Sequence, residues 1–140
     1  MKILLPVDGS EYTKRMLAFV AAHDEFFGKG NEFIVCTAVP PIPVYAARFL
    51  EQHTLTAYYG EEAELVFGPV RKFAAQHDWN VRFLMLRGHA SEEIAVLADE
   101  VSPDLIVMGS HGHSALGNVA LGSVANGVLA RCKTPVLLVR

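Results

Sequence analysis

Short apolar runs alternate with longer segments of helical spacing along this chain. The runs lie at residues 3–7, 33–39, 80–86, 105–108 and 136–139, and charged or turn-forming residues bound them. Runs of this length that are rich in Val, Ile, Leu and Phe are typical of strands buried on both faces of a parallel sheet. The pattern therefore predicts strands that are joined by helices.

The first and third connections carry clear helix signals. Ser10 is predicted to cap a helix over residues 11 to about 27. Ser91 is predicted to cap another helix, and Glu92 and Glu93 fall in its first turn, where carboxylates complement the helix dipole. Both segments are expected to cross over the sheet between parallel strands.

The second and fourth connections are less regular. Residues 46–77 have a helical pattern, but Gly60 is expected to break it and the Gly68-Pro69 pair to mark a second interruption or a kink. A last helix is predicted over residues 119–131, directly after a glycine-rich stretch. The second connection is longer than a minimal crossover between parallel strands requires.

Strand and helix alternation predicts an α/β fold. We expect a three-layer sandwich with a five-stranded parallel sheet of order 3-2-1-4-5 and helices on both faces. The first and fourth strands are then neighbours, and the chain reverses direction across the sheet between them. Such a switch point leaves a crevice at the carboxyl ends of the strands. Asp8 and Gly109 end these two strands, so both should flank the crevice.

The glycines after the fourth strand have a defined spacing, Gly109-x2-Gly112-x9-Gly122-Ser123. No Gly-Lys-Ser/Thr follows, so this is not a Walker A loop, and the glycines are too far apart for the Rossmann fingerprint. Glycine permits positive φ and close approach of a ligand. The start of the following helix offers unpaired N–H groups and a partial positive charge. The stretch therefore predicts a phosphate cradle, although each glycine alone reads as an ordinary turn or cap residue.

This spacing resembles the nucleotide-binding motif of the universal stress protein family, Gly-x2-Gly-x9-Gly-Ser/Thr, at every fixed position. The opening Leu-Pro-Val-Asp-Gly-Ser at residues 5–10 is also similar to that family. The resemblance covers the whole chain and is strongest over residues 1–10 and 104–140. It implies an adenine nucleotide alpha hydrolase-like fold and an ATP-binding regulatory protein of the stress response.

Backbone N–H groups of the glycine stretch are the predicted phosphate ligands. Their residues are Gly109, Gly112, Gly122, Ser123 and Val124, with the Ser123 hydroxyl adding a bond. Ser110 is expected to contribute in the same way. The cradle lacks lysine and arginine, and no positioned base is visible, so we expect binding with little or no turnover and assign no catalytic residue.

The other candidate ligands lie at strand ends. Asp8 is expected to accept a hydrogen bond from ribose or base, or else to act only as a turn-forming residue before the helix. The resemblance implies that Met108 and Ala38 pack against the adenosine half. His111 either contacts phosphate or ribose or is a solvated loop histidine. The pair His111 and His113 is too small a set for a structural metal, although Mg²⁺ could arrive with a triphosphate.

Composition restricts the class of protein. The chain has 140 residues, of which 51% are hydrophobic and 19% charged, with a net charge of −3. One globular domain over residues 1–140 is expected, and neither nucleic acid nor membrane is an expected partner. Cys36 and Cys132 are expected to be reduced core residues. No signal peptide or run of roughly 20 apolar residues appears, so a cytoplasmic location is expected.

The final apolar run predicts an interface. Val136, Leu137, Leu138 and Val139 would form an edge strand, and an uncovered apolar edge favours pairing with another chain. The family resemblance also implies a homodimer through this strand. A slow ATP hydrolase of the adenine nucleotide alpha hydrolase type and a dimeric scaffold with an empty cleft stay open as alternatives. A phospho-receiver domain is rejected, because Leu86-Arg87-Gly88 offers no acceptor aspartate.

Overall fold

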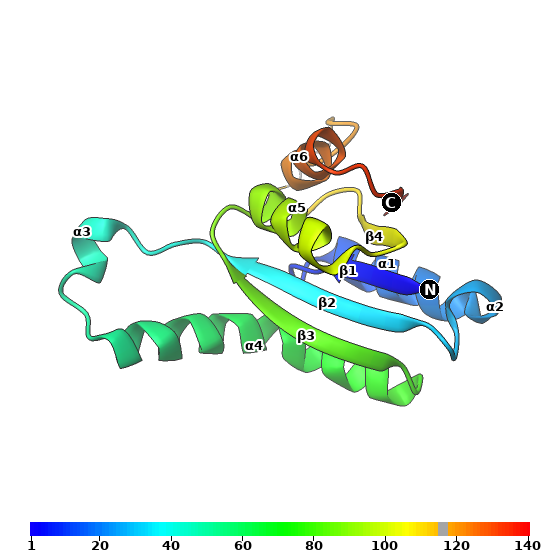
Figure 1. Cartoon of the computed structure of the whole chain (residues 1–140), viewed down its shortest axis with the longest axis horizontal. Coiled ribbons are helices and arrows are strands. Elements are labelled where there is room, and N and C mark those ends of the chain that lie inside the picture. The colour runs from blue at the N-terminus through cyan, green and yellow to red at the C-terminus, as the bar shows by residue number, and fades with distance from the viewer. Residues whose placement is uncertain (115–117) are drawn as a thin grey trace.

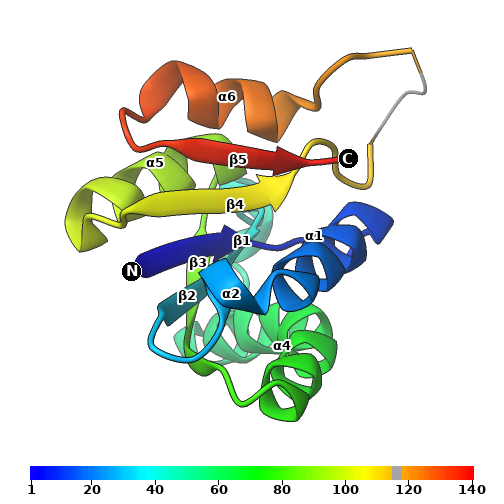
Figure 2. The ribbon, with the colours of Figure 1, turned by 90° about the vertical axis from the view of Figure 1, so that its right-hand side faces the viewer.

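The computed structural model describes residues 1–114 and 118–140, and positions 115–117 of the glycine stretch lie outside the described residues. In chain order the elements are β1 (Lys2–Pro6), α1 (Glu11–Ala22), α2 (Asp24–Phe27), β2 (Glu32–Val39), α3 (Val44–Ala47), α4 (Gln52–Gln76), β3 (Asn80–Arg87), α5 (Ala90–Val101), β4 (Leu105–Gly109), α6 (Ser123–Arg131) and β5 (Val136–Val139). Figure 1 labels the elements from β1 to α6, and Figure 2 labels β5.

The sheet has the predicted topology. Its order is β3-β2-β1-β4-β5, and each neighbouring pair is parallel. Helices α1 and α4 cover one face, and α5 and α6 cover the other, which gives three layers (Figure 2). The predicted α/β sandwich of order 3-2-1-4-5 is therefore confirmed.

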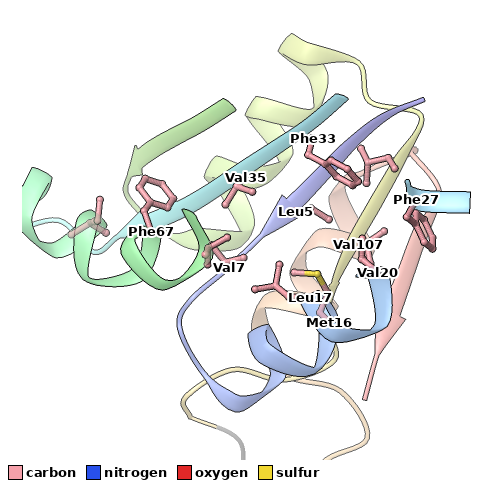
Figure 3. Close-up of a cluster of buried hydrophobic side chains, with 14 of the residues drawn as sticks. Leu5, Val7, Met16, Leu17, Val20, Phe27, Phe33, Val35, Phe67 and Val107 are labelled. Atoms are coloured by element: carbon pink, nitrogen blue, oxygen red, sulfur yellow. The ribbon is translucent and has the colours of Figure 1, made fainter. Parts of the chain in front are cut away.

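Side chains of the central strands alternate between two cores. On one face, Leu5 and Val35 pack with apolar residues of α1 and α4 (Figure 3). On the other face, Leu4 and Ile34 pack against α5 and α6. Full burial of one such side chain contributes about 1.5–3 kcal/mol, so burial on both faces stabilises β1 and β2 strongly. The uninterrupted apolar runs in the sequence follow from this two-sided burial.

The predicted helix over residues 11–27 is two helices. It breaks at His23, whose φ of −113° and ψ of 53° are not helical. The His23 ring Nδ1 lies 2.8 Å from the carbonyl oxygen of Phe19, at the point where the first helix ends. Phe27, in the short α2, is buried in the same core as α1. The break turns α2 so that this aromatic side chain reaches the core.

The predicted breaks at Gly60 and Gly68-Pro69 are wrong. Helix α4 runs through all three residues without interruption, and the break lies earlier, between α3 and α4. Its buried face carries Tyr59, Ala63, Phe67, Val70 and Ala74 at spacings of three and four residues. Burial of these side chains against β2 and β3 outweighs penalties of about 1 kcal/mol for glycine and about 3 kcal/mol for proline. The first turns of α4, together with α3, extend beyond the sheet (Figure 1).

The helix starts at α5 and α6 also differ from expectation. Helix α5 begins at Ala90 with His89 as its N-cap, so Ser91 lies inside the first turn. Helix α6 begins at Ser123 with Gly122 as its N-cap, and the four residues before it are not helical. The later start of α6 places its N-terminus directly beside the glycines.

Candidate functional site

A cavity of about 600 Å³ lies where the sheet order reverses, at the carboxyl ends of β1 and β4. The ends of β2 and the first turns of α5 and α6 complete its wall. Nine of the ten predicted site residues line it, namely Asp8, Ala38, Met108, Gly109, His111, Gly112, Gly122, Ser123 and Val124. The fold thus brings together residues from both ends of the chain.

Ser110 is the predicted site residue that does not line the cavity. Its exposed fraction is 1%, and its N–H donates to the carbonyl of Val139 at 2.8 Å. Its own carbonyl accepts the N–H of Gly122 at 2.7 Å. The N–H groups of Ser110 and Gly122 are therefore both engaged within the protein and are not open donors for a phosphate.

Open donors lie one residue further on, in the first turn of α6. The first intrahelical bond runs from the N–H of Asn126 to the carbonyl of Gly122, at 3.0 Å. The N–H groups of Ser123, Val124 and Ala125 precede that bond and have no intrahelical acceptor. These three residues line the cavity. The positive end of the α6 dipole therefore faces the cavity.

The two oxygens of the Asp8 carboxylate have different surroundings. Oδ1 accepts the N–H of Ser10 at 2.9 Å and the hydroxyl of Thr13 at 3.0 Å, and so orders the turn before α1. Asp8, rather than the predicted Ser10 hydroxyl, thus provides the side-chain bond at this helix start; the Ser10 hydroxyl is buried without a partner among the described residues. Oδ2 lies beside Gly112, and both residues line the cavity.

Both loop histidines bond to protein carbonyls. The His111 Nε2 atom lies 2.7 Å from the Val119 carbonyl oxygen, and its Nδ1 atom lies 2.8 Å from the Ser110 hydroxyl. Its ring also packs 5.0 Å from the ring of Tyr12. The His113 Nε2 atom lies 2.6 Å from the Asp8 carbonyl oxygen. Because both ring nitrogens of His111 are engaged, this side chain shapes the loop rather than presenting a free donor.

The motif glycines provide space rather than positive φ. Gly109, Gly112 and Gly122 are absent from the glycines with positive φ among the described residues, which corrects the expectation that they need that freedom. A Cβ at Gly112 would come within 2.5 Å of Asp8 Oδ2, and one at Gly122 within 3.0 Å of the His111 Cα. The glycines allow the strand ends, the loop and α6 to approach closely around the cavity.

Cationic side chains do not line this cavity in the part of the chain that the structure describes. Arg131 stands at the far end of α6 and pairs with Glu92 at 3.7 Å. Within residues 1–114 and 118–140, no group of three or more His, Cys, Asp or Glu side chains could hold a metal ion. No helix in the same ranges combines the length and apolar character needed to cross a bilayer.

Several residues of the site carried no readable signal in the sequence. Thr13, in the first turn of α1, donates a hydrogen bond to the Asp8 carboxylate. Ile94 and Leu121 are apolar residues that line the cavity. In the sequence His113 forms only an incomplete metal pair with His111, whereas in the structure it bonds to a backbone carbonyl 105 residues away. Such partners are set by the fold, and no local pattern encodes them.

A doubly wound sheet with its cavity at the switch point defines an α/β domain whose ligands bind at the carboxyl ends of the strands. A sequence model described as the Universal stress protein family matches residues 1–140. The chain therefore belongs to the universal stress protein family. A Thermus aquaticus relative, named universal stress protein in the QAH/OAS sulfhydrylase 3' region, is 34% identical over 138 residues, covering 99% of this chain and 97% of the relative.

Solved structures agree with this assignment. The structure of MJ0577 from Methanocaldococcus jannaschii, described as a hypothetical protein with a structure-based assignment of its biochemical function, is 29% identical with a TM-score of 0.79, covering 99% of this chain and 94% of that one. The Archaeoglobus fulgidus universal stress protein in complex with dAMP is 21% identical with a TM-score of 0.69, covering 100% and 98%. The likeness to MJ0577 shows an adenine nucleotide alpha hydrolase-like fold. At 21% identity, the likeness to the Archaeoglobus fulgidus protein shows the shared fold alone.

Proposed function

We propose that the switch-point cavity binds an adenine nucleotide, with ATP as its ligand, and that this chain is a regulatory module of the stress response. One observation carries the proposal. Ser123, Val124 and Ala125, whose N–H groups are open, line a cavity that Asp8 also lines. Helix N-termini bind phosphate through such groups, and a carboxylate suits a ribose hydroxyl or base donor.

Three parts of the cavity wall suit the phosphates, the ribose and the adenine ring of the nucleotide. The first turn of α6 would hold the phosphates, and the Ser123 hydroxyl would add a bond. Asp8 Oδ2 would accept from ribose, since Oδ1 is already bonded within the turn. Ala38 and Met108 lie at strand ends on an apolar part of the wall, which suits the adenine ring. Mg²⁺ would enter bound to the triphosphate, because the described residues offer it only one carboxylate at the cavity.

Little or no turnover is expected at this site. Fast phosphoryl transfer requires cationic stabilisation and a group that positions the attacking water. No lysine or arginine is present among the described lining residues, and Asp8 Oδ1 is committed to the α1 turn. We therefore propose a nucleotide sensor of the cytoplasm rather than an enzyme. Phosphate release over hours from Mg-ATP would reveal the alternative, a slow hydrolase.

Calorimetry tests the nucleotide proposal. Purified protein is titrated with ATP, AMP, dAMP and GTP, and a heated extract is analysed for co-purified nucleotide. Gly122→Val should abolish binding, because its Cβ alone would meet the His111 Cα at 3.0 Å and crowd the α6 N-terminus. Gly60→Val is the matched control, since a Cβ there meets nothing within 4 Å. Equal ATP affinity in wild type and folded Gly122→Val, or no nucleotide affinity in wild type, would refute the proposal.

A homodimer through β5 is the second part of the proposal. Strand β5 is the last in the sheet order, and Val136, Leu137, Leu138 and Val139 are all half-buried. Antiparallel pairing with a second copy would cover this apolar edge. Sedimentation equilibrium at micromolar concentration should show a dimer, and Leu137→Lys should reduce it to monomer. A wild-type monomer at that concentration would refute the interface.

A further inference from the structure

We infer that His113 is a positioning residue of the cavity, which holds the glycine loop at the spacing from Asp8 that a bound nucleotide requires. The glycine loop here means the described residues 110–114 and 118–122. The inference rests on the proposed nucleotide function and adds a residue outside the glycine spacing. Figure 2 shows the loop leaving β4 and returning to α6, beyond the carboxyl ends of the strands.

The contact itself has a defined chemistry. His113 Nε2 lies 2.6 Å from the backbone carbonyl oxygen of Asp8, across 105 residues of sequence. A carbonyl oxygen only accepts, so the hydrogen is on Nε2. The neutral ring is then the Nε2–H tautomer, and a doubly protonated ring keeps the same donor. Nε2 is therefore the donor of this bond in both forms of the ring.

His113 has no substitute among the described hydrogen bonds of the loop. The bonds of Ser110 run to β5, to Gly122 and to His111, and the His111 ring bonds to Ser110 and Val119 within the loop. In the described part of the chain, the His113 bond alone joins the loop to the turn after β1. The tilted rings of His111 and Tyr12, with centroids 5.0 Å apart, add a contact without a hydrogen bond.

The bond lies beside the groups that the nucleotide would use. Asp8, Gly112 and His113 all line the cavity. Asp8 Oδ2 lies so near Gly112 that a Cβ there would approach it to 2.5 Å. The His113 bond holds the main chain of Asp8 at one side of this contact. It thus sets the distance between the carboxylate and the loop before the ligand arrives, and such preorganisation favours binding.

The test compares three substitutions at one position. His113→Ala removes the donor, His113→Asn places an amide too short to reach the carbonyl, and His113→Gln places an amide N–H near the position of Nε2. We expect His113→Ala and His113→Asn to weaken ATP binding about two- to fivefold, the lower part of the range for one hydrogen bond, because this side chain is exposed. Most of the change should appear as faster dissociation. His113→Gln should restore the wild-type affinity.

Controls separate positioning from a general structural role. His53→Ala removes an exposed histidine of α4, whose Nδ1 lies 3.1 Å from a carboxylate oxygen of Glu51, and it should leave ATP affinity unchanged. Equal affinities in wild type, His113→Ala and His113→Asn would overturn the inference. Weakened binding that His113→Gln fails to restore would also overturn it, because the donor would then not be the cause.

Amide hydrogen exchange in nucleotide-free protein keeps the inference distinct from the proposed function. In the peptide 109–114, His113→Ala and His113→Asn should exchange faster than wild type and His113→Gln. Unchanged exchange in the alanine and asparagine variants would overturn the positioning role even if ATP binds. A wild type that binds no nucleotide would refute the proposed function, and the exchange rates would still decide whether His113 holds the loop.

Discussion

Replacing Gly109 with alanine tests whether this glycine is required for close packing of α1 and the loop against β4. Gly109 ends β4 and does not have a positive φ, so the backbone itself accepts a side chain. A Cβ there would lie 2.7 Å from the Tyr12 Cβ and 3.2 Å from both the Tyr12 carbonyl carbon and the His111 carbonyl oxygen. Two of these atoms are main chain, and a rotamer change cannot move them. Helix α1 or the loop must therefore shift.

The magnitude follows from two opposing effects. Overpacking of this kind costs about 1–3 kcal/mol. Alanine in place of glycine raises the unfolding free energy by about 0.4–1 kcal/mol, because it restricts the conformations of the unfolded chain. The net loss is about 1–2 kcal/mol of unfolding free energy, which lowers the melting temperature by roughly 3–8 °C in a domain of this size. Gly60→Ala is the matched control: a Cβ there meets nothing within 4 Å, and the residue is inside α4.

Urea unfolding measures the unfolding free energy of both variants. The single tryptophan, Trp79, stacks on buried Phe33 with ring centroids 4.6 Å apart, so its fluorescence reports the core. Gly60→Ala should gain about 0.5–1 kcal/mol, because alanine favours the helix interior over glycine. The two substitutions should thus change stability in opposite directions. A Gly109→Ala protein as stable as Gly60→Ala would refute the steric argument for this glycine.

Three further predictions concern the site, the long helix and the thiols. Gly112→Ala should weaken ATP binding about tenfold or more by calorimetry, with little change in melting temperature. The new methyl group would lie 2.5 Å from Asp8 Oδ2 and would push this oxygen away from its position. Pro69→Ala should raise the unfolding free energy by about 1–3 kcal/mol in urea, because proline inside α4 lacks an N–H. Burial raises the pKa of Cys36 to about 12, and burial together with Asp99 raises the pKa of Cys132. Raised values leave less thiolate at pH 8, so native alkylation followed by mass spectrometry should modify Cys132 slowly and Cys36 only after unfolding.

The strands and their order could be predicted because one physical cause dominates them. Central strands such as β1 and β2 are covered on both faces, so their sequences are apolar without interruption. Alternation with helices then leaves few topologies that keep right-handed crossovers. The order 3-2-1-4-5 is one of these topologies, and in that order the cavity lies between the first and fourth strands.

Helix interiors could not be predicted as well, because the local signal is smaller than the packing it competes with. Gly60 and Pro69 disfavour a helix by a few kcal/mol together. Tyr59, Phe67 and Val70 bury their side chains against the sheet only if the helix continues. The sum of that burial exceeds the local penalty. At His23 the balance is reversed, since the break lets Phe27 reach the core.

The glycine spacing located the site but did not indicate what each glycine accommodates. A Cβ would meet Tyr12 at Gly109, the Asp8 carboxylate at Gly112, and the loop main chain at Gly122. The first contact belongs to the packing of α1 on β4, and the second belongs to the cavity wall. The same residue type is therefore required at successive positions for unrelated reasons. The glycine spacing thus combines a requirement of the fold with a requirement of the site, and only substitution at single positions separates the two.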